Sequence, residues 1–281
     1  MGALELGLLA AICWGFHDVC VRFISQRTSI SACILTVLIV GLIFHITLMM
    51  TQNNFSLISK TAFAYAAIAG IFYVIASFGL YHAFKRGPVK LVAPLVASFP
   101  ILSISWAIWI GTPVSSLQIL AVFAIIIGVS IVAIMSDNSL EHFPPIGKTI
   151  VISLVASSAF AGTFAAGQAA AELSPHMSVT FITRIISILF CIGVIHFASL
   201  SYRPNRPAIP WLIAMGCADG LALWCVFSAG ALTNPQYASV ASSIFGLITI
   251  LLAWIFLKER MTIIQWVGCI ITFLGVGYLA I

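Results

Sequence analysis

Charged side chains are scarce in this sequence. Only 7% of its 281 residues are Asp, Glu, Lys or Arg, whereas 62% are hydrophobic, and the mean hydropathy is +1.18. A soluble globular domain has about a quarter charged residues, so these charges are too few to cover a surface that faces water. The net charge of +5 comes from basic residues that stand singly or in pairs, without the patch that a nucleic acid requires. The sequence therefore predicts an integral membrane protein with no nucleic-acid partner.

Patterns that hold cofactors or carry out catalysis are also missing. The seven cysteines are scattered through apolar runs, with no Cys-x-x-Cys motif and no clustered histidines. We interpret them as packing residues and expect no disulfide framework, metal or cofactor. No nucleotide-binding motif, histidine cluster or facing pair of acids is present, so we expect a protein that is not an enzyme. The N-terminus has Glu5 and no basic residue before the first apolar run, unlike a signal peptide, and we expect that run to be retained.

Apolar runs of membrane-spanning length are abundant. About 20 residues of helix cross a hydrocarbon layer of roughly 30 Å. Such runs lie at roughly 3–22, 30–50, 61–84, 89–110, 114–135, 149–171, 177–200, 210–232, 236–257 and 262–281. The connections are too short for a soluble catalytic domain. The predicted fold class is an all-α membrane protein with ten transmembrane helices, in contact with membrane lipid.

The sequence repeats itself at a constant offset. A shift of 235 − 88 = 147 positions places Pro235 on Pro88, and the same shift places Gln265 on Gln118 and Gly275 on Gly128. We interpret this as an internal duplication, with a first repeat at 1–135, a linker at 136–145 and a second repeat at 146–281. Five helices per repeat is an odd number, so the second repeat enters the membrane from the opposite side. This predicts two inverted five-helix repeats, as in many secondary transporters.

Several short motifs resemble those of the EamA-like branch of the drug/metabolite transporter superfamily. They are Pro-x-x-x-small before an apolar helix, the corner Leu257-Lys258-Glu259-Arg260-Met261-Thr262, Gln265-x-x-Gly268, Gly275-Val276, Ala11-Ile12-Cys13-Trp14-Gly15-Phe16 and Thr183-Arg184. In the first repeat Gly111-Thr112-Pro113 stands in place of the charged corner. The resemblance covers both halves and implies a ten-helix carrier of small metabolites, but these motifs do not identify a substrate.

The distribution of basic residues predicts an orientation. One set of connections holds ten Lys and Arg residues and the opposite set only Lys60. Positive residues favour the cytoplasmic side, so we expect both termini outside a plasma membrane, the inner membrane in a bacterium.

Two ionisable residues lie deep in predicted helices. Arg184 is about 10 Å from one membrane surface by helical rise, and Asp219 is about 14 Å from the other. In a layer of roughly 30 Å their depths differ by about 6 Å, within reach of an extended arginine side chain. Such groups need partners. The pair could be structural, or the two residues could bind the opposite charges of a zwitterionic solute, with Asp219 also a candidate cation or proton site.

A second polar pair, His17 and Asp18, lies near the basic end of the first predicted helix. In the structural alternative, Asp18 pairs with Arg22 at i,i+4 near the membrane interface. The functional alternative places both at the mouth of a cavity, with His17 as a proton carrier because imidazole titrates at about pH 6.5.

The remaining candidates are aromatic or hydrogen-bonding side chains within the predicted helices. Most should pack, face lipid or bond their own backbone, but some could stack on an organic solute or hold an amine by cation–π attraction. The complete set of predicted substrate-binding residues is Trp14, His17, Asp18, Tyr73, Ser77, Tyr81, Phe164, Gln168, Arg184, Asp219, Trp224 and Ser243.

The ionisable candidates do not repeat between the halves. The shift of 147 places Asp219 on Phe72, Arg184 on Val37 and Asp18 on Ala165. An asymmetric polar lining suits an unsymmetrical polar molecule. We therefore expect a secondary active transporter, an exporter of a small polar metabolite such as an amino acid or amine, which works by alternating access around a central cavity. Protons are a candidate coupling ion, and the protein could be a monomer or a homodimer. The alternatives are an uptake carrier or facilitator, or a non-transport membrane subunit.

Overall fold

The described part of the protein consists of helices and short connections between them. The computed structural model describes residues 1–51, 57–102, 115–136, 144–232 and 236–279. The first repeat contains α1 (Ala3–Ile24), α2 (Ile30–Thr51), α3 (Lys60–Arg86), α4 (Val89–Val96) and α6 (Ser116–Ser136). The second contains α7 (Ile146–Leu173), α8 (His176–Phe197), η1 (Arg206–Ala208), α9 (Ile209–Ser228), η2 (Ala229–Ala231), α10 (Gln236–Ser242), α11 (Phe245–Leu252), the π-helix η3 (Ala253–Leu257) and α12 (Ile263–Leu279).

Seven described helices are long and apolar enough to cross a membrane, and three shorter apolar helices accompany them. The all-helical class is confirmed. The count of ten spans stays a prediction, because part of the run 89–110 lies outside the described residues. The corner Gly111-Thr112-Pro113, most of the linker 136–145 and the dipeptide Asn234-Pro235 lie outside them as well.

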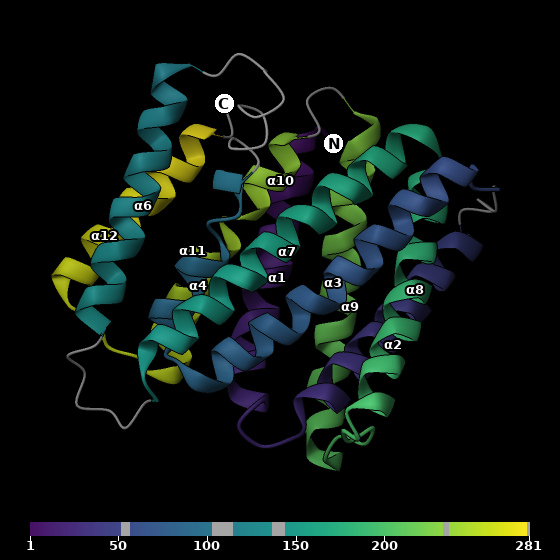
Figure 1. Cartoon of the computed structure of the whole chain (residues 1–281), viewed down its shortest axis with the longest axis horizontal. Helices are drawn as coiled ribbons and strands as arrows, with labels where there is room; N and C mark the ends of the chain where they lie inside the picture. The colour runs from purple at the N-terminus through teal and green to yellow at the C-terminus, as the bar shows by residue number, and fades with distance from the viewer. Residues whose placement is uncertain (52–56, 103–114, 137–143, 233–235, 280–281) are drawn as a thin grey trace.

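The main contacts between the repeats occur in exchanged pairs. The shift of 147 relates α1 to α7, α2 to α8, α3 to α9 and α6 to α12. Helix α3 packs on α7 as α9 packs on α1, and α2 packs on α9 as α8 packs on α3. Figure 1 shows α6 and α12 together at one edge and α2 and α8 at the other, with α1 and α7 between them. This arrangement is expected when two copies of one unit pack around an approximate two-fold axis.

Small residues allow α6 and α12 to approach each other closely. A Cβ atom added at Gly268 would lie 2.8 Å from the carbonyl oxygen of Gly128, and one added at Gly275 would lie 2.8 Å from that of Ala121. The shift of 147 exchanges these two contacts, because 121 + 147 = 268 and 128 + 147 = 275. Membrane helices associate closely where small residues let their backbones meet.

The same helix is interrupted in both repeats. Helix α4 begins at Val89 and ends at Val96, and the related α10 begins at 89 + 147 = 236 and ends at Ser242. At each break serine hydroxyls donate to carbonyl oxygens three residues earlier, Ser98 to Leu95 and Ser243 to Val240. Such bonds compete with the helical pattern. Matched discontinuous helices commonly mark the binding site of a transporter.

Candidate functional site

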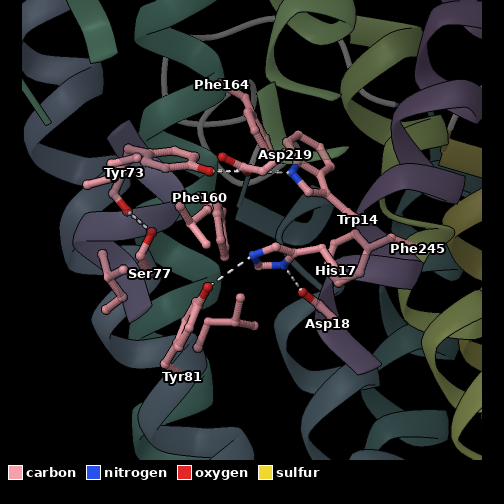
Figure 2. Close-up of a pocket in the computed structure, with 14 residues that line it drawn as sticks. Trp14, His17, Asp18, Tyr73, Ser77, Tyr81, Phe160, Phe164, Asp219 and Phe245 are labelled. Atoms are coloured by element: carbon pink, nitrogen blue, oxygen red, sulfur yellow. Dashed lines mark hydrogen bonds and ion pairs between the residues drawn. The ribbon is translucent and has the colours of Figure 1, made fainter. Parts of the chain in front are cut away.

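A buried cavity lies between the two repeats, close to the break that precedes α11. Its lining comes from α1, α2, α3, α7, α9 and α11. Its open volume is about 20 Å³, room for about one water molecule. The cavity is therefore closed in this conformation. The lining residues are Trp14, His17, Asp18, Ile34, Val37, Leu38, Tyr73, Ser77, Leu80, Tyr81, Phe160, Phe164, Asp219 and Phe245, most of which Figure 2 labels.

Asp219 lies at one end of the cavity, and both of its carboxylate oxygens accept hydrogen bonds. The Nη2 atom of Arg184 donates to Asp219 Oδ2 over 2.6 Å. The indole N–H of Trp14 donates to Oδ1 over 3.1 Å, and the Tyr73 hydroxyl donates to the same oxygen (Figure 2). Arg184 is 0% exposed and its Cζ lies 4.9 Å from the centre of the Tyr73 ring. The ion pair of Arg184 and Asp219 has no net charge. Breaking such a buried pair is costly because it leaves a charge without a partner.

The other end contains Asp18, whose carboxylate has a hydrogen-bond partner at one of its two oxygens. The Nδ1 atom of His17 lies 3.0 Å from Asp18 Oδ1, and Nε2 of the same ring lies 3.2 Å from the Tyr81 hydroxyl (Figure 2). Asp18 Oδ2 is buried and has no hydrogen-bond partner among the described residues. The side chain of Asp18 is only 2% exposed. A buried carboxylate oxygen without a donor is unfavourable, so this end can accept a further positive or hydrogen-bonding group.

Aromatic rings form the wall between the two polar ends. The rings of Phe160 and Phe164 stack with centroids 5.9 Å apart, and Trp14 lies 5.3 Å from Phe164 and 6.3 Å from Phe245. The quadrupole of such rings favours cations over their faces. The wall is suited to an apolar or aromatic body with a cationic group.

The structure brings together eight of the twelve predicted substrate-binding residues around the cavity. These are Trp14, His17, Asp18, Tyr73, Ser77, Tyr81, Phe164 and Asp219. Ser77 donates to its own helix, to the carbonyl of Tyr73 over 2.8 Å. That any of these residues binds a solute stays a prediction.

The other four predicted residues do not line the cavity. Arg184 lies behind Asp219 as its ion-pair partner. Gln168 donates to the carbonyl of Val226 over 3.3 Å, and Trp224 packs edge-on to His176 with ring centroids 6.2 Å apart. The Ser243 hydroxyl bonds the backbone at the helix break, as serine in a membrane helix commonly does.

The i,i+4 pair of Asp18 and Arg22 is not the arrangement found. The Nδ1 atom of His17 occupies Asp18 Oδ1. The guanidinium of Arg22 instead donates to the carbonyl of Phe84 over 2.8 Å and lies 3.7 Å from the Glu259 carboxylate. The reason is that Arg22 lies at the last turn of α1, where a long side chain reaches the neighbouring helix ends.

Six lining residues were not predicted: the aliphatic Ile34, Val37, Leu38 and Leu80 and the aromatic Phe160 and Phe245. Phe160 lies one helical turn before Phe164 and therefore shares its face, a signal that the sequence contains. Phe245 follows Ser242-Ser243 directly, and only the break between α10 and α11 turns it into the cavity. Among the described residues no three of His, Cys, Asp and Glu gather in a metal-binding arrangement.

The charged corner of the second repeat closes the basic end of the molecule. The Glu259 carboxylate accepts hydrogen bonds from the backbone N–H groups of Val89 (2.9 Å) and Lys90 (3.4 Å) at the start of α4. Lys90 Nζ in turn donates to the carbonyl of Arg260 over 3.2 Å. Burial raises the pKa of Glu259, against the opposing effect of these N–H donors and of Arg22. One side chain thus ties the second repeat to α1 and α4 of the first.

Comparisons with known proteins agree with the two-repeat fold. The model of the EamA-like transporter family matches residues 1–134 and again residues 147–281. An uncharacterized protein of Methanocaldococcus jannaschii is 26% identical over 133 residues, which are 47% of this chain and 96% of the relative. A solved structure described only as "Crystal structure of protein" has a TM-score of 0.68 and 12% identity, and the match covers 98% of this chain and 95% of that one. At that identity the likeness concerns the fold alone.

Proposed function

The chain belongs to the EamA-like transporter family, and on that premise we propose that it is a secondary active transporter of a small polar metabolite such as an amino acid or amine. The family consists of membrane transporters of small solutes, and the protein is an integral membrane protein. The proposed mechanism is alternating access around the cavity described above, with the direction of transport outward. The proposed substrate-binding residues are the eight predicted ones that line the cavity, together with Phe160 and Phe245.

The observation that carries this proposal is the position and lining of the cavity. It lies between two repeats that pack in exchanged pairs, and it contains two buried carboxylates, Asp18 and Asp219. Ionisable residues within a membrane are costly and are normally retained for a function. A structural subunit of the membrane has no need of an open carboxylate oxygen inside a cavity.

Alternating access requires the closed cavity to open on each side in turn. The contacts of Glu259 with Arg22 and with the start of α4 join the repeats at the basic end, and we propose that they break when that end opens. The proposed moving units are the repeats 1–135 and 146–281, inverted with respect to each other, with ten transmembrane helices in all and the linker 136–145 between them.

We further propose that the basic end faces the cytoplasm and that the termini lie outside. Helix α1 begins and α12 ends on the same side of the molecule (Figure 1), and Arg22, Arg86 and Lys258 lie at helix ends on the opposite side. A reporter that works only outside the plasma membrane should be active when fused after Ile281, while one that works only in the cytoplasm should be inactive. The reverse pattern would overturn this orientation.

Transport can be tested with the purified protein in liposomes. A thermal-shift screen of a metabolite panel selects solutes that stabilise the folded protein, and counterflow of the selected solutes measures transport. Ser77→Leu places a bulky side chain in the cavity and should abolish flux. Ser130→Leu makes the same change on an exposed face of α6, at a serine that also donates to the carbonyl four residues earlier, and should preserve it. Equal flux through both variants would contradict transport through this cavity, and flux that ignores proton and sodium gradients would indicate a facilitator.

A further inference from the structure

The open oxygen of Asp18 narrows the class of solute that the cavity takes. We propose, on the premise of the transport function above, that the Asp18 carboxylate binds in turn a proton and the ammonium group of an organic cation with an apolar body, each excluding the other. This assigns a cationic amine, in place of a zwitterion, as the substrate class, and it assigns exchange for a proton as the coupling.

The Asp219 end offers no free charge to a zwitterion. Its carboxylate already has Arg184, Trp14 and Tyr73 as donors. Arg184 has further guanidinium N–H groups without partners among the described residues, but its side chain does not line the cavity and the Tyr73 ring covers its Cζ atom at 4.9 Å. A solute carboxylate therefore meets the carboxylate oxygens of Asp219 and Asp18, and the described lining residues include no Lys or Arg.

The Asp18 end has the opposite property. Asp18 Oδ2 is buried, lacks a partner among the described residues and belongs to a side chain that lines the cavity. Among the described residues, the ionisable groups nearest to Asp18 are His17 and Cys20 on the same helix, Tyr81 on α3, and Asp219 on α9 with Arg184 beyond it. Helix α11 contributes no ionisable side chain. Of these, His17 contacts Asp18 directly. One proton bound to this pair cancels the charge of the carboxylate.

The size of the cavity decides which cation neutralises the pair in this conformation. An open volume of about 20 Å³ accommodates one water molecule and no organic cation, so in the proposed exchange a proton neutralises the pair while the cavity is closed. When the cavity opens, an ammonium group R–NH₃⁺ can take the place of the proton, which leaves to solvent. One positive charge replaces another, no covalent bond of the solute changes, and the site stays neutral. The rings of Trp14, Phe160, Phe164 and Phe245 then hold the apolar body and face the cation.

The experiment compares three probes that differ in one group. Phenethylammonium carries the cation and an aromatic body, phenylalanine adds a carboxylate, and 2-phenylethanol replaces the ammonium by a neutral hydroxyl. Binding to the purified full-length protein is measured by thermal shift at several pH values, and proton release is measured with a pH indicator in weak buffer. We expect phenethylammonium to bind at least tenfold more tightly than the other two. We also expect its affinity to rise by up to about tenfold per pH unit as the competing proton is lost, with one proton released per cation bound.

The matched variants separate Asp18 from acids in general. Asp18→Asn should lose phenethylammonium binding and the released proton, whereas Glu172→Gln, which neutralises an exposed acid near the end of α7, should keep both. Binding of phenethylammonium that is independent of pH, that releases no proton, or that persists in Asp18→Asn overturns the proposal. Tighter binding of phenylalanine than of phenethylammonium also overturns the proposal.

The outcome also distinguishes this inference from the transport function on which it rests. If none of the three probes binds while liposomes still exchange a labelled metabolite, the assignment of a cationic amine is wrong and transport stands. If the liposomes exchange no solute from a broad metabolite mixture, the transport function itself fails.

Discussion

Two carboxylates in one cavity are equally buried but differently surrounded. Asp219 is 1% exposed and both of its oxygens accept hydrogen bonds, one of them from the arginine that neutralises it. Asp18 is 2% exposed and has one oxygen bonded to His17 and one without a partner among the described residues. Depth in the membrane therefore does not identify a binding residue by itself. The missing partner makes Asp18 the stronger candidate of the two, because one of its oxygens can take a proton or a solute group without first displacing a protein group.

The largest effect on stability should come from removing Arg184, the ion-pair partner of Asp219. Arg184→Gln leaves Asp219 buried without its counter-charge, and breaking a buried ion pair on one side costs about 3–5 kcal/mol. We expect the unfolding free energy in detergent to fall by that amount and the folded yield to fall with it. The double variant with Asp219→Asn removes both charges and should recover part of the loss. Wild-type stability in Arg184→Gln would show that the pair does not hold the Asp219 end together.

The two tyrosines allow a smaller, matched test of the same contrast. Tyr73→Phe removes a donor to the charged Asp219, a kind of bond that contributes about 1.5–3 kcal/mol, whereas Tyr81→Phe removes a bond to the His17 ring, which contributes about 0.5–1.5 kcal/mol. Both side chains lie on α3, both are buried and both lose the same atom. Denaturant unfolding of the two variants should give the larger loss for Tyr73→Phe. Equal losses, or a larger loss for Tyr81→Phe, would contradict the assignment of the charged pair to the Asp219 end.

Among the cavity variants, neutralising Asp18 should change the free energy of unfolding least. Asp18→Asn keeps the shape of the side chain and removes a charge that has no arginine beside it. We expect its unfolding free energy to stay within about 1 kcal/mol of the natural protein, whereas Asp219→Asn strands the buried Arg184 and should lose several times as much. Unfolding of both variants at one pH provides the comparison. A severe loss in Asp18→Asn would mean that Asp18 has a structural role of the kind assigned to Asp219.

The ion pair of Arg184 and Asp219 was predictable from the sequence, because the positions of the two residues along their helices give them similar depths in the membrane. Helical rise placed Arg184 and Asp219 within reach of each other, and the structure joins them at 2.6 Å. The all-helical class and the two repeats were predictable for a similar reason, because apolar length and a constant offset are properties of the chain itself. The partners Trp14 and Tyr73 lie on other helices, so their bonds to Asp219 depend on helix rotations that no local pattern specifies.

The Asp18 end and the cavity wall were less predictable. Whether Asp18 contacts Arg22 or His17 depends on where the end of α1 lies relative to Glu259 and Phe84. The segment Ala238–Leu257 has a mean hydropathy of 2.4 despite its serines, so hydropathy indicated one continuous span and not the break at Ser242-Ser243. That break follows from serine bonds to the backbone and from Gly246, where an added Cβ would lie 2.7 Å from Ala97. The serine bonds are local, but the contact of Gly246 with Ala97 joins segments far apart in the sequence.

Glu259 is a third, largely buried carboxylate that can be compared with Asp219 and Asp18. Like Asp219 it has hydrogen-bond donors, but it lies in a connection between helices. Its partners are the N–H groups of Val89 and Lys90 and the guanidinium of Arg22, yet burial raises its pKa above the ordinary value of 4.5. The folded protein therefore binds this proton more tightly than the unfolded chain does. The stabilising contribution of the protonated side chain is complete below about pH 4.5 and is lost as the pH rises through the raised pKa.

Glu259→Gln keeps an oxygen that can accept from Val89 and cannot titrate. We therefore expect the natural protein to lose stability relative to this variant as the pH is raised from 4.5, and the difference to become constant above the raised pKa. The change should be about 1 kcal/mol or less, as for ion pairs near a surface, and smaller than any effect at Asp219. Unfolding of both proteins across this pH range measures it, with the exposed Glu172→Gln as control. A difference that grows in favour of the natural protein as the pH rises would show that the donors outweigh burial. In that case Glu259 would resemble Asp219, a carboxylate whose partners fully compensate its position.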